Sequence, residues 1–266
     1  MIKVTGIPYD ANSSFLKGPA FAPARIRLMD TEGSANAFSE SITEIKEGIN
    51  YIDTGDLFFE NTNAAKAFAT IKTHIGKLLE DGSKIISLGG DHSVSYPIID
   101  AFAEKFGKLN ILHLDAHADL YADFDNNPFS HASPFARIME TGKINSLTQV
   151  GIRTLTTHLK DQAKKFGVTV IDMINFNYDF IKTLQSPLYI SLDIDVLDPA
   201  FAPGISHHEP GGLSTRELLN IIQQLNGPSI VGADIVEYNP ARDVNNVTAM
   251  VAYKLLKELI AKMSAT

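Results

Sequence analysis

Three short segments rich in Asp and His each come directly after an apolar run that predicts a buried strand. The segments are Gly-Gly-Asp-His-Ser at 89–93, Asp-Ala-His-Ala-Asp at 115–119 and Asp-Ile-Asp at 193–195, and the apolar runs before them are 84–88, 109–114 and 188–192. Carboxylates this close together repel one another and lose hydration when a fold buries them, so the arrangement costs stability unless a cation balances it. We therefore expect these segments to meet around positive charge.

Strands and helices are expected to alternate along the whole chain. Strands are predicted at 2–7, 48–52, 84–88, 109–114, 147–152, 168–171, 188–192 and 230–235. Helices are predicted at 20–29, 63–81, 95–106, 134–141, 215–224 and 247–263, with further helical segments beside the strands at 147–152 and 168–171. This alternation predicts right-handed crossovers and a parallel sheet covered on both faces. Because no linker or repeat interrupts it, we expect one α/β domain spanning 1–266.

Composition narrows the classes of partner. The formal net charge is −8, which argues against binding to nucleic acid, because that needs clustered Lys and Arg, and favours metal ions or a small cation. No run approaches the ~18 apolar residues that a membrane-spanning helix needs, and residues 1–6 lack the apolar stretch of a signal peptide. The absence of Cys excludes disulfides, thiolate metal sites and a cysteine nucleophile. A soluble, cytoplasmic protein is expected.

Six side chains of these segments are candidate metal ligands. They are His92, Asp115, His117, Asp119, Asp193 and Asp195. Ligands of open parallel sheets gather beyond the carboxyl ends of the strands, where all six are expected. Carboxylate oxygens suit hard divalent cations, and imidazole adds affinity for Mn²⁺ and other transition metals. The set predicts a centre of two divalent metals and, with it, a hydrolase that activates water.

Each of these residues also has a simpler interpretation when taken alone. A single Asp in a loop is most often a turn or cap residue, and a single buried His is most often a hydrogen-bonded packing residue. The common position after a strand argues against that interpretation for all six together. His113 shares a strand face with Asp115, so it either supports that ligand from behind or simply packs in the strand.

The three segments resemble the signature motifs of the ureohydrolase family, which includes arginases and agmatinases. The resemblance runs from Gly-Ile-Pro-Tyr-Asp at 6–10 to Glu237. It implies a three-layer αβα sandwich around a mostly parallel sheet, and two Mn²⁺ ions per chain. It also implies that His92, Asp115, Asp119 and Asp193 hold one ion and that His117, Asp115, Asp193 and Asp195 hold the other. Asp115 and Asp193 would then bridge the pair.

The same resemblance implies three catalytic residues. His131, in Phe-Ser-His-Ala-Ser at 129–133, matches a family histidine that shuttles protons, a role suited to a group that titrates near neutral pH. Glu237 matches the glutamate that grips the guanidinium through paired hydrogen bonds. Asp119 would stabilise the tetrahedral intermediate and share proton delivery with His131. An exposed loop histidine and a surface glutamate near a turn are the alternatives.

The implied reaction is hydrolysis of a small cationic guanidino substrate to urea and an amine. Agmatine is expected first, giving putrescine, because 130–135 and 209–213 resemble the agmatinase versions of these loops. Arginine comes second, and other guanidino acids and formimidoylglutamate stay open. Ile-Ser-His-His at 205–208 stands where many relatives carry Thr-Gly-Thr-Pro, so the loop 202–212 departs from the family pattern where it borders the substrate tail.

Two other classes of function and two properties stay open. A deacetylase-like amidohydrolase would hold one Zn²⁺, but His92 and the Asp193–Asp195 pair supply more ligands than one zinc needs. A non-catalytic regulator would be expected to have lost ligands, and none is missing. Ni²⁺ and Co²⁺ suit the same ligands as Mn²⁺. The resemblance implies a homo-oligomer, a trimer or hexamer.

Overall fold

One parallel sheet of eight strands forms the centre of the protein. The computed structural model describes residues 1–59 and 63–265, so residues 60–62 and 266 of the predicted domain lie outside the described residues. The strands are β1 (Ile2–Gly6), β2 (Tyr51–Asp56), β3 (Lys84–Leu88), β4 (Leu109–Leu114), β5 (Ile144–Ile152), β6 (Thr169–Asp172), β7 (Leu188–Asp193) and β8 (Ile230–Val236). Their order is β2-β1-β3-β8-β7-β4-β5-β6, and each neighbouring pair is parallel. The expected sheet is confirmed.

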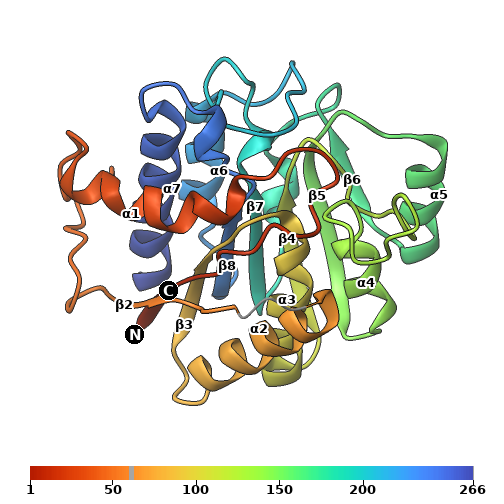
Figure 1. Cartoon of the computed structure of the whole chain (residues 1–266), viewed down its shortest axis with the longest axis horizontal. Helices are drawn as coiled ribbons and strands as arrows, with labels where there is room; N and C mark the ends of the chain where they lie inside the picture. The colour runs from red at the N-terminus through yellow and green to blue at the C-terminus, as the bar shows by residue number, and fades with distance from the viewer. Residues whose placement is uncertain (60–62, 266) are drawn as a thin grey trace.

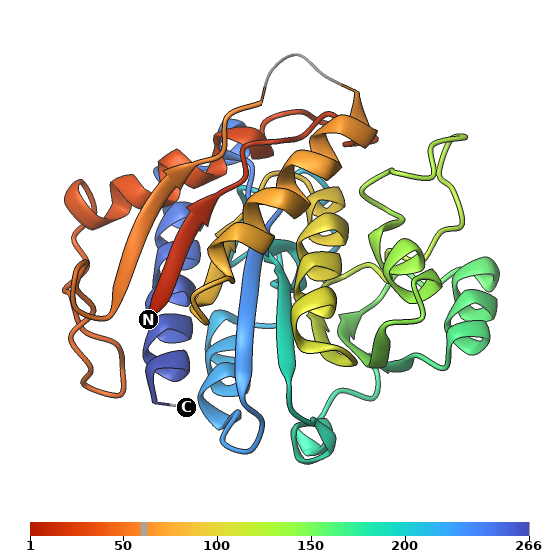
Figure 2. The ribbon, with the colours of Figure 1, turned by 90° about the horizontal axis from the view of Figure 1, so that it is seen from below.

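Helices cover both faces of the sheet and complete the expected three-layer sandwich (Figure 1). One layer contains α1 (Ala22–Thr31), α6 (Thr215–Gln224) and α7 (Val247–Ser264). The other contains α2 (Ala64–Leu78), α3 (Ser95–Phe106), α4 (Pro134–Glu140) and α5 (Thr157–Phe166). In Figure 2, α2 and α3 cross in front of the sheet and α7 lies behind it.

Alternate residues of the central strands face opposite helical layers. In β3, Ile86 and Leu88 pack with α1, α6 and α7, whereas Ile85 packs with α2 to α5. In β4, Leu112 packs with α1, α6 and α7, and Ile111 packs with α2 to α5. Both sets are buried because helices cover both faces, which is why these strands are nearly continuous apolar runs in the sequence.

Capping residues explain where two of the predicted helices begin. The side chain of Asn63 accepts a hydrogen bond from the backbone N–H of Lys66 and starts α2. Ser214 and Glu217 form a capping box at the start of α6, which runs over the predicted residues 215–224. Each cap satisfies backbone N–H groups that have no partner inside the helix.

The second strand was predicted too early in the chain. Residues 48–52 were expected, but β2 spans Tyr51–Asp56. Gly48 has a φ of 79° and its N–H donates to the carbonyl of Tyr51 at 2.8 Å, so the segment turns before the strand begins. The strand then continues through polar residues because it lies at the sheet edge and pairs only with β1. An edge strand need not be an apolar run of the kind from which the strands were predicted.

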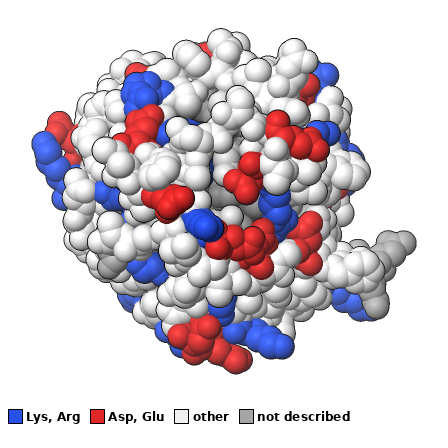
Figure 3. All heavy atoms as spheres, turned by 90° about the vertical axis from the view of Figure 1, so that its left-hand side faces the viewer, with Lys and Arg blue, Asp and Glu red and all other residues white. Residues whose placement is uncertain are grey.

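Surface features bear on the possible partners. Among the described residues no helix combines the length and apolar character needed to cross a membrane. On the face in Figure 3, Lys and Arg side chains stand among Asp and Glu side chains and do not merge into one broad basic area. Ion pairs of the protein surface include Arg27 with Asp53 at 2.6 Å. A face of mixed charge is not suited to a phosphate backbone.

Candidate functional site

Four adjacent strands end at one edge of the sheet and bring the three motifs together. In order across the sheet they are β3, β8, β7 and β4. His92 begins a short 3-10 turn after β3, Asp115 follows β4, Asp193 ends β7, and Glu237 follows β8. All four side chains are buried. The convergence follows from the parallel topology, because carboxyl ends of neighbouring parallel strands meet at the same edge.

A close backbone contact explains the Gly-Gly pair before His92. A Cβ atom on Gly90 would lie 1.8 Å from the carbonyl oxygen of Tyr9. The N–H of the next residue, Asp91, donates to that same carbonyl at 2.9 Å. Any larger side chain at position 90 would therefore displace the turn that carries His92.

One nitrogen of His92 faces three carboxylates. Nδ1 lies 3.1 Å from Asp115 Oδ2, 3.1 Å from Asp119 Oδ2 and 3.2 Å from Asp193 Oδ2. This nitrogen is buried and has no hydrogen-bond partner among the described residues. Polar atoms with no partner are rare in protein interiors, so a buried nitrogen that faces three carboxylates is suited to binding a metal ion together with them.

The other nitrogen of His92 is hydrogen-bonded inside the protein. Nε2 lies 3.0 Å from Oγ of Ser191, and that hydroxyl donates its proton to Asp234 Oδ1 at 2.7 Å. A serine has only one hydroxyl proton, so the bond between His92 and Ser191 requires a proton on Nε2. The lone pair of the neutral ring then lies on Nδ1 and points at the carboxylates. This is the tautomer that a metal ligand needs.

Shifts in pKa show that this cluster stabilises added positive charge. Burial opposes the charge of His92, but the nearby carboxylates of Asp115, Asp119 and Asp193 outweigh it and raise its pKa well above the ordinary value. Burial and the charges of Asp195 and Asp115 raise the pKa of Asp193 well above its ordinary value. Burial and repulsion from Asp115 raise the pKa of Asp195 to about 6. Divalent cations would relieve the same repulsion, so the donor set fits a metal pair.

A second group of ligands lies next to the first. Nδ1 of His117 is 2.9 Å from Asp195 Oδ2 and 3.4 Å from Asp115 Oδ1. Ligand atoms of these three residues lie within 4.8 Å of one another. His117 is half-buried, whereas Asp115 and Asp195 are buried. The second group is therefore the more open of the two.

The three predicted catalytic residues border these groups. Nδ1 of His131 is 2.7 Å from Glu237 Oε1, and its Nε2 is 2.8 Å from Oγ of Ser14. The backbone N–H of His92 also donates to Glu237 Oε1, at 2.8 Å. Asp119 and Glu237 both have positive φ angles, 48° and 64°. Such backbone is uncommon for these residue types and is often retained at functional sites.

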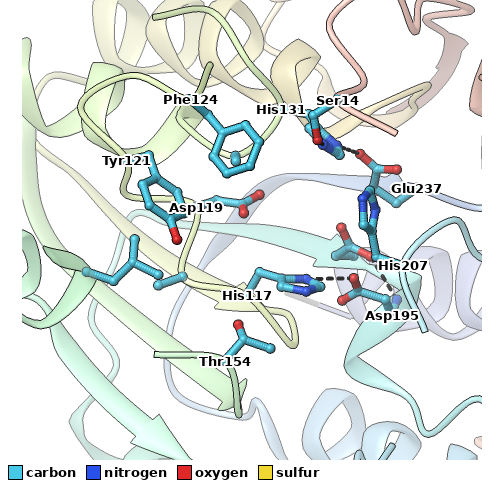
Figure 4. A pocket seen from close by; sticks show the side chains of 14 residues that line it. Ser14, His117, Asp119, Tyr121, Phe124, His131, Thr154, Asp195, His207 and Glu237 are labelled. Atoms are coloured by element: carbon cyan, nitrogen blue, oxygen red, sulfur yellow. Dashed lines mark hydrogen bonds and ion pairs between the residues drawn. The ribbon is translucent and has the colours of Figure 1, made fainter. Parts of the chain in front are cut away.

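Part of this site lines a cavity of about 170 Å³, namely Ser14, His117, Asp119, His131, Asp193, Asp195 and Glu237. In Figure 4, His131 points toward Glu237, His117 points toward Asp195, and Tyr121 and Phe124 form the opposite wall. His207 also lines it. The cavity gives a small molecule access to the carboxylate cluster.

Several residues of the site were missed in the sequence. Ser191 and Asp234 lie inside strands, where their polarity is unexpected among buried residues. Ser191 shares a strand face with Asp193, so the two-residue period could have found it. Ser14 comes from the loop that follows residues 6–10, outside the three motifs that carry the metal ligands, and no local pattern identifies it.

The fold and the site define a metal-dependent hydrolase. A model of the Arginase family matches residues 1–261, and the chain belongs to this family. Its members include proteins named for hydrolysis of different guanidino compounds, so membership establishes the reaction class and leaves the substrate open.

Some of the relatives are named arginase and others are named agmatinase. "Arginase 1, mitochondrial" of Arabidopsis thaliana is 46% identical over 274 residues, covering 97% of this chain and 80% of that protein. "Agmatinase" of Bacillus anthracis is 33% identical over 269 residues, covering 97% of this chain and 90% of that protein. The solved structure "Arginase from Medicago truncatula" is similar with a TM-score of 0.92 and 42% identity, covering 98% of this chain and 87% of that one.

Proposed function

We propose that the chain hydrolyses a small guanidino compound to urea and an amine at a centre of two Mn²⁺ ions, with arginine as the first candidate substrate. The observation that carries this proposal is the buried Nδ1 of His92, which faces three carboxylate oxygens at 3.1–3.2 Å. A neutral occupant would leave the carboxylate repulsion in place, so a cation fits this position best.

Six side chains would hold the two ions. His92, Asp115, Asp119 and Asp193 would bind one, and His117, Asp115, Asp193 and Asp195 would bind the other. Two divalent ions supply hydroxide near neutral pH and neutralise negative charge that develops during the reaction. The sharing of Asp115 is supported by its distances to His92 and to His117, and that of Asp193 by its distance to His92 and by the repulsion between Asp193 and Asp195.

The remaining side chains bind substrate and move protons. Glu237 would pair with the guanidinium through two hydrogen bonds and hold its carbon beside the carboxylate cluster. Burial opposes the charge of His131, but Glu237 outweighs it and raises the pKa of His131 to about 9. In metal-free protein, His131 therefore holds a proton near neutral pH. A guanidinium cation on Glu237 would repel this charge, which favours transfer of the proton to the departing amine. Asp119, at the cavity wall, would stabilise the cationic amine.

Arginine and agmatine differ by one carboxylate, and two observations favour different choices. The plant relative named arginase is 46% identical to this chain and the bacterial relative named agmatinase is 33% identical, which supports arginine. Among the described residues that line the cavity there is no Lys or Arg, so no guanidinium or ammonium side chain is there to pair with the carboxylate of arginine. That feature supports agmatine, which stays the second candidate, as the loops 130–135 and 209–213 suggest.

A substrate panel tests the proposal. The purified chain, loaded with Mn²⁺, is assayed for urea release from arginine, agmatine, 4-guanidinobutyrate and 3-guanidinopropionate, and separately for loss of formimidoylglutamate. The highest kcat/KM is expected with arginine. A strong preference for agmatine would reverse the order of the two candidates, and the absence of urea from all four compounds would refute the function.

The metal itself separates this proposal from its main alternative. Two Mn²⁺ per chain are expected in the active protein. One Zn²⁺ per chain together with amide hydrolysis would support the deacetylase-like alternative. A cytoplasmic location and a trimeric or hexameric assembly stay predictions.

A further inference from the structure

A third histidine lies directly against the proposed metal centre. His113 is on β4, two residues before Asp115, and is fully buried. Its ring stacks on Phe135 of α4 with ring centroids 3.8 Å apart, and it meets the ring of His92 edge-on at 5.1 Å. Packing against Phe135 and His92 therefore holds the ring in one plane, so each ring nitrogen of His113 faces a fixed neighbour.

Both ring nitrogens of His113 are used inside the protein. Nε2 lies 2.7 Å from Asp115 Oδ2, and Nδ1 lies 3.0 Å from the amide nitrogen of Gln149 on β5. The same amide nitrogen donates to the backbone carbonyl of Ala118 at 2.6 Å. An amide oxygen placed against that carbonyl would be repelled, so Ala118 determines which end of the Gln149 amide faces His113.

The orientation of this amide decides where His113 carries its proton. Because Gln149 donates to Nδ1, that nitrogen accepts, and the proton of the neutral ring lies on Nε2, from which it is donated to Asp115. The amide oxygen of Gln149 is buried with no partner among the described residues, which costs roughly 1–3 kcal/mol. Turning the amide over would give this oxygen a donor but would face it with the carbonyl of Ala118.

We propose that Gln149 and His113 act together as positioning residues that hold the carboxylate of Asp115 in the orientation that binds metal. The two side chains connect Ala118 to Asp115, so they also brace the ligand-bearing segment 115–119 at both ends. Ligand atoms of His113, His92 and Asp115 lie within 4.8 Å of one another. His113 is nevertheless a support and not a ligand, because neither ring nitrogen is free. This inference rests on the metal centre of the proposed function.

We call the two hydrogen bonds that join Gln149 to His113 and His113 to Asp115 the relay. Mn²⁺ binding to purified variants of the chain tests whether the relay positions Asp115. His113→Leu removes the donor to Asp115, His113→Gln retains an amide N–H there, and Gln149→Met removes the group that sets the tautomer. Loss of a side chain that supports a metal ligand typically weakens metal binding about 10- to 100-fold. His113→Leu is expected to show such a loss by equilibrium dialysis against Mn²⁺ alone, Gln149→Met a smaller loss, and His113→Gln nearly wild-type binding. At saturating Mn²⁺ the KM for substrate should not change.

A matched control separates the relay from general packing. Gln162 on α5 is also buried and donates to the neighbouring loop carbonyl of Leu120 at 3.0 Å, which is a backbone group and not a metal ligand. Gln162→Met should bind Mn²⁺ as the wild type does. The relay is refuted if Gln162→Met and Gln149→Met weaken binding equally, or if folded His113→Leu binds normally. If His113→Leu does not fold, the comparison of Mn²⁺ binding between Gln149→Met and Gln162→Met decides whether the relay supports metal binding.

The outcome is distinguishable from failure of the proposed function. Wild-type protein that binds two Mn²⁺ but releases no urea would refute the guanidino activity and leave the relay intact. Normal Mn²⁺ binding by both His113→Leu and Gln149→Met, with full urea release, would refute the relay alone.

Discussion

His131 and Glu237 lie 106 residues apart in the sequence, yet a hydrogen bond of 2.7 Å joins His131 Nδ1 to Glu237 Oε1. Burial opposes charge on both groups, but their mutual attraction raises the pKa of His131 to about 9 and lowers that of Glu237. The proposed proton carrier and the proposed guanidinium-binding group are thus an ion pair before substrate arrives.

This ion pair predicts a pH dependence of stability. The raised pKa of His131 stabilises the fold fully below its ordinary value of 6.5, and this contribution is lost as the pH rises through about 9. The lowered pKa of Glu237 contributes above its ordinary value of 4.5 and is lost as the pH falls. In metal-free protein, His131→Asn should therefore reduce the free energy of unfolding by on the order of 3 kcal/mol near pH 6 and by much less above pH 9. Denaturant titrations at a series of pH values measure this, and a pH-independent difference would contradict the ion pair.

Removing the charge of Asp193 should have opposite effects with and without metal. Its pKa is raised well above the ordinary value because burial and the neighbouring carboxylates disfavour its charge, so Asp193→Asn should stabilise metal-free protein. In Mn²⁺ at 100 times Kd, the wild type should gain about 2.7 kcal/mol for each site, and the variant should lose most of this gain. Thermal melts in EDTA and in Mn²⁺ test the reversal. Asp179→Asn, at an exposed surface ion pair, is the control and should change neither curve appreciably. Equal melting of Asp193→Asn and wild type in Mn²⁺ would remove Asp193 from the ligand set.

Glu237→Gln should separate metal binding from substrate binding. The glutamine retains an oxygen for the backbone N–H of His92 but cannot form a charged pair with guanidinium. Hydrogen bonds to charged groups contribute roughly 1.5–3 kcal/mol, so kcat/KM should fall by at least one to two orders of magnitude. Metal analysis should still find two Mn²⁺ per chain. A variant that loses its metal instead would make Glu237 part of the metal centre.

Gly90→Ala should disturb the turn that carries His92. The new Cβ would lie 1.8 Å from the Tyr9 carbonyl, and overpacking of this kind costs typically 1–3 kcal/mol. Lower thermal stability and weaker Mn²⁺ binding are expected. Gly76→Ala is the matched control, because its Cβ would have no atom within 4 Å and it lies in helix α2. There alanine should stabilise the protein by roughly 0.5–1 kcal/mol. Normal Mn²⁺ binding by Gly90→Ala would show that the turn tolerates the side chain.

Most of the fold could be predicted because its central strands are buried on both faces. Continuous apolar runs marked β3, β4, β7 and β8, and amphipathic periods marked the helices between them. The position of β2 could not be predicted in this way, because a polar edge strand is selected by its pairing with β1. The insertion of β8 between β3 and β7 also depends on contacts between distant segments.

The residues of the candidate site also fall into those that a sequence motif predicts and those that only contacts between distant segments bring together. His92, Asp115 and Asp193 could be predicted because each follows a strand in a recognisable motif. Gln149 and Ser14 could not, since each reaches the site from a segment without a motif. Their partners, His113 and His131, are fixed only when strands β4 and β5 pair and the N-terminal loop closes over the cavity.

The proposed metal-dependent activity is tested best by a titration of metal-free protein with Mn²⁺ in which bound metal and urea release from arginine are measured on the same samples. We expect no urea without metal, two Mn²⁺ bound per chain at saturation, and a rate that rises with the bound metal. Full activity in the presence of EDTA, or two bound Mn²⁺ with no urea from any guanidino compound, would contradict the central claim that this carboxylate–histidine cluster is a catalytic metal centre.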